Sequence, residues 1–124
     1  MINNEVYQFI YDQIAPFLPE KWEKLVCYLE YGESSYTVSF FVRIDGKYIN
    51  CFDLPSASED KLYGAFDAID EVVMVERNKQ KEKLWTNMTI CVDEDGKMHT
   101  DFDYTDLSES AYEHEQEWKE KYLK

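Results

Sequence analysis

The sequence predicts an α+β domain with an antiparallel sheet of about five strands, in the order helix, three strands, helix, two strands, helix. Three observations predict it. Apolar residues recur at helical spacing in some segments and alternate with polar residues in others. Tight turn sequences such as Asp45-Gly46 join neighbouring strand segments, as expected for antiparallel hairpins. A helical segment separates the two groups of strands, which is typical of the α+β class.

The first helix is expected to run to about residue 18. Asn3 or Asn4 is a suitable N-cap, because a short side-chain oxygen can accept from a free backbone N–H. Pro16 lacks an N–H and can end the helix early, and Pro19 is a firm stop. The helical stripe consists of Val6, Phe9, Ile10, Ile14, Phe17 and Leu18.

Three strands are expected next, over residues 25–31, 36–44 and 47–52, as a meander with short connections. Phe41 points away from the apolar face of the middle strand. Either helices cover both faces of the sheet or Phe41 is exposed for a partner, and we favour the covered arrangement. The apolar face of that strand consists of Tyr36, Val38, Phe40, Val42 and Ile44.

The second helix is expected to begin at a capping box formed by Ser56 and Glu59. Residues 76–83 form the only markedly basic segment, and they are interpreted as the solvated helix end and a loop, because cations suit a helix C-terminus. The buried face of this helix is predicted to consist of Leu62, Phe66, Ile69, Val72 and Val73.

The last hairpin joins strands at about 84–92 and 97–104 through a turn at 93–96. A final helix follows, capped by Ser108 or Asp106, with Ala111, Trp118 and Tyr122 near one stripe. Side chains alternate across a strand, so one face of the last strand is expected to pack inward: Met98, Thr100, Phe102 and Tyr104. The other face is expected to stand in water: Lys97, His99, Asp101 and Asp103.

Composition narrows the functional class. The 124 residues fit one domain, 1–124, and 10 Tyr, 7 Phe and 3 Trp argue against disorder. A net charge of −13 disfavours binding to nucleic acid or an anionic membrane and favours a basic partner. Three cysteines without a CxxC motif are interpreted as reduced hydrophobic residues, and no signal peptide is recognised, so a cytoplasmic location is expected.

Two groups of residues are candidates for a site of chemistry. One strand face carries His99, Asp101 and Asp103. These side chains could ligate a metal, and the protein would then be a small metal-dependent hydrolase that uses them. The simpler interpretation is a solvated strand face, because no second group of ligands accompanies the three residues. The segment 93–96 is similar to part of a calcium loop but lacks the later ligands. We therefore expect no catalytic residue, no metal and no cofactor.

Five blocks of sequence together resemble the YezG-like immunity proteins. They follow in order over about residues 5 to 110: 19–24 (PEKWEK), 38–41 (VSFF), 53–55 (DLP), 85–90 (WTNMTI), and 96–98 (GKM) with 101–107 (DFDYTDL). The resemblance implies a cytoplasmic antitoxin to a nuclease-type toxin exported by a type VII secretion system. It implies no enzymatic activity. The segment after Ser110 is short and Glu-rich and carries no motif of this family.

A toxin-binding surface is predicted on the last strand. Carboxylates about 7 Å apart repel each other by roughly 0.6 kcal/mol in water and by about 2.4 kcal/mol at an effective dielectric near 20, so a basic partner would relieve the repulsion. The candidate residues are Asp101, Asp103, Asp106 and Glu109. An acidic regulatory module for another basic protein is the remaining alternative, and the sequence leaves the oligomeric state open.

Overall fold

The computed structural model describes residues 3–32, 35–79, 84–108 and 111–124. Its helices are α1 (Asn4–Ile14), α2 (Glu59–Asn78) and α3 (Ala111–Tyr122). Its strands are β1 (Lys24–Tyr31), β2 (Tyr36–Ile44), β3 (Lys47–Asn50), β4 (Asn87–Asp93) and β5 (Met98–Asp103). The α+β class and the order of helices and strands predicted from the sequence are confirmed.

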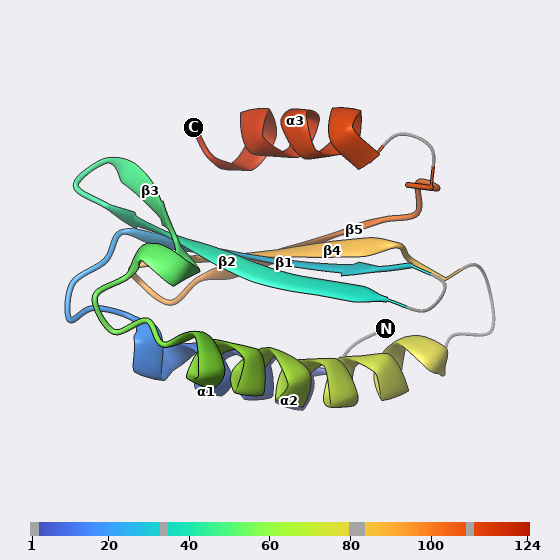
Figure 1. Cartoon of the computed structure of the whole chain (residues 1–124), viewed down its shortest axis with the longest axis horizontal. Coiled ribbons are helices and arrows are strands. Elements are labelled where there is room, and N and C mark those ends of the chain that lie inside the picture. Colours follow the sequence, from blue (N-terminus) through green and yellow to red (C-terminus); the bar gives the residue numbers. More distant parts are fainter. Residues whose placement is uncertain (1–2, 33–34, 80–83, 109–110) are drawn as a thin grey trace.

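The five strands form one sheet in the order β3-β2-β1-β4-β5, and every neighbouring pair is antiparallel. The two helices α1 and α2 lie against one face, and α3 lies across the other face (Figure 1). The molecule therefore has three layers, and β1 lies at the centre of the middle layer. The strands β3 and β5 are the two edges of the sheet.

None of the described helices is long and apolar enough to cross a membrane.

The first helix begins where the sequence predicts and ends before the expected residue 18. Asn3 is the N-cap, and its side-chain oxygen accepts from the Val6 N–H at 3.1 Å. The α-helical bonding ends at Ile14, and the chain tightens into a 3₁₀ turn over Ala15–Phe17. Pro16 explains the change, because it has no N–H to donate to the preceding turn.

The central strands bury the predicted face. Phe40 and Val42 are completely buried, and Phe40 packs between Phe17 at 6.4 Å and Phe66 at 6.2 Å, measured between ring centroids. Phe41, on the opposite face of β2, lies 5.6 Å from the ring of Trp118 in α3. Helices thus cover both faces of the sheet, as favoured from the sequence.

The third strand is shorter than predicted. It ends at Asn50, and residues Cys51–Asp53 form a 3₁₀ turn. The cause is the Asn50 side chain, which accepts from the Phe52 N–H at 3.0 Å and so bends the chain away from β2. At the other end of the hairpin, Asp45 and Gly46 have positive φ angles of 51° and 79°, as a tight two-residue turn requires.

The predicted capping box is wrong. The N-cap of α2 is Ser58, and its side chain makes no capping hydrogen bond. The Ser56 hydroxyl instead donates to the Phe17 carbonyl at 2.6 Å, which ties the start of α2 to the end of the first helical segment. A longer-range partner outcompetes the local cap at this position.

The segment between α2 and β4 also differs from prediction. β4 begins at Asn87 rather than at residue 84, because Trp85 leaves the sheet and is completely buried. Arg77 is partly buried: its guanidinium lies over the rings of Tyr31 and Trp85, at 5.0 and 5.3 Å. Its Nε donates to the Trp85 carbonyl at 2.7 Å. The rest of the predicted basic segment, residues 80–83, lies outside the described residues.

Candidate functional site

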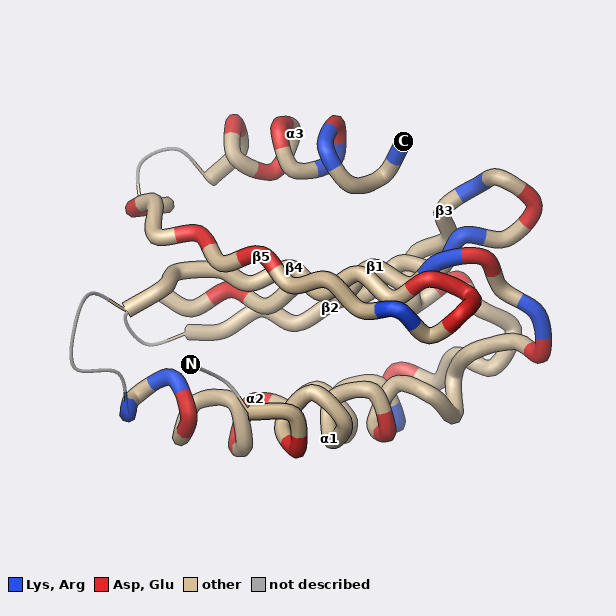
Figure 2. Tube along the Cα trace, turned by 180° about the vertical axis from the view of Figure 1, so that it is seen from behind, with Lys and Arg blue, Asp and Glu red and all other residues tan. Residues whose placement is uncertain are grey.

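The predicted acidic residues lie on the edge strand β5. Asp101 is opposite Thr89 and Asp103 is opposite Asn87 on β4. Both carboxylates lie on the face of the sheet that α3 covers, because Asp101 contacts Tyr122 and Asp103 lies 4.0 Å from Nδ1 of His114. The strand β5 runs along the near edge of the molecule in Figure 2. Their side chains remain 37% and 40% exposed, so they are partly covered and still accessible from solvent.

The carboxylate of Asp101 is held on both sides. Its Oδ2 accepts from the Tyr122 hydroxyl at 2.5 Å, and its Oδ1 lies 2.8 Å from Nε2 of His99. The hydrogen bond from Tyr122 is the main cause of a lowered pKa for Asp101. Burial opposes the shift, and the contact with His99 adds to it. The surroundings of Asp101 therefore favour its ionised form.

Asp103 is held by its own local turn. Its Oδ1 accepts from the backbone N–H and the hydroxyl of Thr105, at 2.9 and 2.7 Å. Burial alone would raise the pKa of Asp103. The hydrogen bonds from Thr105 and Asn87 and the charge of His114 outweigh burial, so the pKa lies below its usual value.

The other two predicted residues lie beyond β5. Asp106 is exposed, and its Oδ1 accepts from the Ser108 N–H at 3.0 Å, which stabilises the turn after the strand. Glu109 falls outside the described residues. The described part of the last helix begins at Ala111, so neither predicted cap, Ser108 or Asp106, lies directly before it. The structure therefore brings Asp101 and Asp103 onto one strand and places Asp106 in the turn that follows.

A hollow of about 270 Å³ separates β5 from α3. Asp101 and Asp103 line it from the strand, and Glu117 and Lys121 line it from the helix. The side chain of His114 is only 15% exposed, and its Nε2 lies 3.1 Å from the Tyr28 hydroxyl. The sequence pattern of α3 does not predict this contact, because the contact depends on how the helix packs on the sheet.

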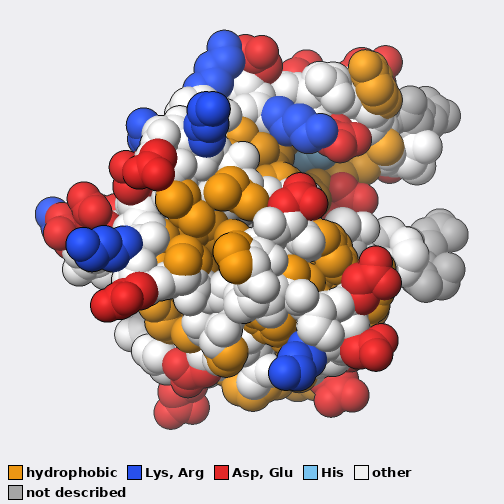
Figure 3. Space-filling model, turned by 60° about the vertical axis from the view of Figure 1, so that its left-hand side comes forward, with side chains coloured by type: hydrophobic (Ala, Val, Ile, Leu, Met, Phe, Trp, Pro, Cys, Tyr) orange, Lys and Arg blue, Asp and Glu red, His pale blue; other side chains and the backbone are white. Residues whose placement is uncertain are grey.

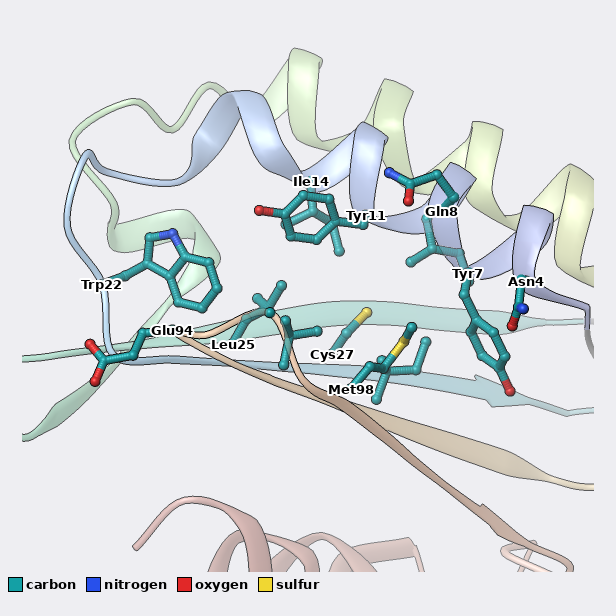
Figure 4. Close-up of a pocket in the computed structure, with 14 residues that line it drawn as sticks. Asn4, Tyr7, Gln8, Tyr11, Ile14, Trp22, Leu25, Cys27, Glu94 and Met98 are labelled. Atoms are coloured by element: carbon teal, nitrogen blue, oxygen red, sulfur yellow. The ribbon is translucent and has the colours of Figure 1, made fainter.

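The opposite side of β5 borders a second and more apolar space. A groove of about 480 Å³ lies between α1 and the ends of the strands. In Figure 4, Tyr7 and Tyr11 come down from α1, Met98 points up from β5, and Trp22 and Glu94 lie at one end. Glu94 is the only charged residue among the described residues that line the groove.

The inward face of β5 is therefore less covered than predicted. Met98 is 48% exposed and Tyr104 is 42% exposed, whereas Phe102 packs against Trp85 at 5.7 Å. The groove lies beside Met98, and Tyr104 comes after the last residue of the strand. Only the middle of the predicted apolar face of β5 packs against the hydrophobic core.

The sequence interpretation missed the groove. Trp85 and Trp118 are buried, whereas Trp22 is half-buried at the groove. The available signal was the pair Tyr7 and Tyr11, which stand four residues apart on one side of the helical stripe. Aromatic residues beside the buried stripe of a helix indicate that the adjoining side of the helix is only partly buried against the sheet.

The arrangement offers little for metal chemistry. Among the described residues, no group of three or more His, Cys, Asp or Glu side chains is placed to hold a metal ion. Of the proposed trio, His99 and Asp101 form a pair, and Asp103 is turned to Thr105. Cys27 and Cys51 are buried free thiols and Cys91 is half-buried, in line with the sequence interpretation.

Comparison with known proteins assigns the chain to a protein family. The family described as immunity protein YezG-like matches residues 3–124. The chain belongs to the YezG-like immunity protein family. Immunity protein YezG of Bacillus spizizenii is 30% identical over 115 residues, covering 83% of this chain and 69% of that protein. Immunity protein YezG of Bacillus subtilis is 28% identical over 130 residues, covering 96% of this chain and 86% of that protein.

Membership of the YezG-like family supports an immunity role and implies an inhibitor that acts by binding rather than by catalysis. The match includes the acidic last helix, which the resemblance seen in the sequence did not reach. The edge strand β5, with its acidic hollow on one side and its apolar groove on the other, is the candidate binding surface of this immunity protein.

Proposed function

We propose that this chain binds and neutralises a basic, nuclease-type toxin in the cytoplasm of the producing cell, before a type VII secretion system exports the toxin. The observation that carries the proposal is the net charge of −13 on a member of an immunity family. A nuclease needs clustered Lys and Arg to hold phosphates, and an acidic partner complements such a surface.

The proposed contact residues are Asp101, Asp103, Asp106 and Glu109 at the β5 edge. The hydrogen bonds that hold the first two lower the pKa of each carboxyl, so these bonds favour the negatively charged form. On the face drawn in Figure 3, hydrophobic side chains gather within a rim that carries both acidic and basic side chains. The net charge of −13 attracts a basic partner at long range, and apolar side chains give it a contact at short range.

The direct test is an inhibition titration. The cognate toxin domain is purified, and its cleavage of a labelled DNA or RNA is followed while the chain is added. We expect cleavage to fall to background at one equivalent of the chain. Unchanged cleavage at excess chain would contradict the proposed function.

A second measurement separates blockage of the active site from distortion of the toxin. A non-cleavable oligonucleotide is added to the toxin before the chain. Blockage predicts that the oligonucleotide slows association in proportion to its occupancy. If the association rate is independent of the oligonucleotide, the chain binds elsewhere on the toxin and acts by distorting it.

A further inference from the structure

The strand β5 has an open hydrogen-bonding edge. It is the last strand in the sheet order and pairs only with β4 in the part of the chain that the structure describes. The carbonyl of Lys97 accepts from the Asp93 N–H at 3.0 Å, so its backbone faces β4. Because this orientation alternates along an antiparallel strand, the backbone groups of Met98, Thr100 and Phe102 face outward.

The two sides of this edge differ in chemistry. On the α1 side, the groove between Tyr7, Tyr11 and Met98 is apolar apart from Glu94. On the α3 side, the hollow is lined by three carboxylates, Asp101, Asp103 and Glu117, together with Lys121 and His114. A strand laid along β5 would send alternate side chains into these two spaces, because side chains alternate across a sheet.

We propose that the toxin adds a strand to the β5 edge, through a segment in which apolar and basic residues alternate. This inference rests on the proposed function and specifies how the partner is held. The apolar side chains enter the groove beside Tyr11 and Met98. The basic side chains face Asp101 and Asp103, and main-chain hydrogen bonds form along the edge.

The acidic side of β5 disfavours a second copy of the chain as the occupant. Pairing two β5 strands would bring the Asp101 and Asp103 carboxylates of both copies together, at a net charge of −13 on each. Like charges directly opposite on paired strands are destabilising. A segment carrying Lys or Arg at alternate positions removes this repulsion.

Thr100 allows the edge to be blocked without disturbing the sheet. Its backbone N–H faces away from β4, so Thr100→Pro removes an outward donor and leaves the bonds to β4 in place. Thr100→Val is the matched control, because it loses the hydroxyl and keeps the N–H. Both variants are first compared with the parent by thermal unfolding, so that a folding defect is recognised.

The probe is a seven-residue peptide of alternating Lys and Val, with blocked ends. It spans roughly 23 Å, and the six residues of β5 span about 20 Å. Its control has the same composition with the lysines grouped at one end. Amide hydrogen exchange of the ¹⁵N-labelled chain is measured at low salt with each peptide.

We expect the alternating peptide to slow exchange at Met98, Thr100 and Phe102 by about tenfold, with no such effect in Thr100→Pro and the parental effect in Thr100→Val. The grouped peptide should protect these amides far less. Unchanged exchange at these residues would overturn strand addition, even when the toxin still binds. A dimer in sedimentation that Thr100→Pro disrupts would also overturn it, in favour of a second copy.

Discussion

The indole Nε1 of Trp118 donates a hydrogen bond to the hydroxyl oxygen of Thr89 at 2.8 Å, and this contact joins α3 to the sheet. Both residues are buried, at 7% and 2% exposure. The Trp118 ring also lies 4.9 Å from Tyr28 and 5.6 Å from Phe41. Trp118 is the one buried residue within the described helix, so the attachment of α3 depends on it.

Trp118→Ala is expected to release α3 from the sheet. The substitution removes a large buried side chain and leaves a cavity, a change that typically costs about 3–5 kcal/mol. Hydrogen exchange should show loss of protection across Ala111–Tyr122, with β1 and β4 retaining theirs. Retained protection in α3 would show that other contacts hold the helix.

Thr89→Val separates the hydrogen bond from the packing in this contact. It leaves the indole N–H without its acceptor, which costs about 1–3 kcal/mol for a buried donor. Denaturant unfolding should therefore show a smaller loss than for Trp118→Ala. An equal loss would mean that the hydrogen bond, rather than ring packing, dominates the contact.

The central strand offers a matched test of the two sheet faces. Phe40→Ala should lower the free energy of unfolding by about 3–5 kcal/mol, because Phe40 is fully buried between Phe17 and Phe66. Ser39→Ala, on the opposite face, should cost far less. Denaturant unfolding measures both, and similar losses would contradict the assigned faces.

The fold was predictable because its signals are local. Alternation along β2 identified the buried face, and the Asp45-Gly46 dipeptide identified the hairpin. The failures occurred where a distant partner decides the outcome. Ser56 donates to Phe17 and Arg77 packs on Trp85, and neither partner is apparent from the local pattern.

The site was predictable only in part for the same reason. The alternation of β5 places Asp101 and Asp103 on one face, which sequence reasoning recovers. It cannot recover the hydrogen bond from Tyr122 or the burial of His114, because both depend on how α3 lies on the sheet. The groove was missed because it forms between α1 and β5, which are far apart in the chain.

Stability should fall in acid through Asp101 and Asp103. Both carboxyls have a lowered pKa in the folded chain, so near that pKa the unfolded chain binds more protons. Their contribution is present above the unfolded pKa of about 3.9 and is lost as pH falls through the lower folded pKa.

The variant that carries both Asp101→Asn and Asp103→Asn should therefore lose less stability than the parent below about pH 4. Urea unfolding midpoints of the two proteins across this range provide the measurement. The two pH profiles should differ in slope in this range. Parallel profiles would show that these carboxyls do not contribute to acid sensitivity.

The most direct measurement of the central claim is the binding kinetics of the toxin domain across an ionic-strength series. Asp101→Asn and Asp103→Asn preserve side-chain shape and remove charge. The parent's association rate should fall steeply with salt, because exposed charges act mainly on encounter. Each variant should associate more slowly at low salt, and a carboxylate desolvated against Lys or Arg should cost about 2–5 kcal/mol, mostly as faster dissociation. If both variants bind like the parent at low salt, the acidic side of β5 does not contact the toxin, and the account of this surface is wrong.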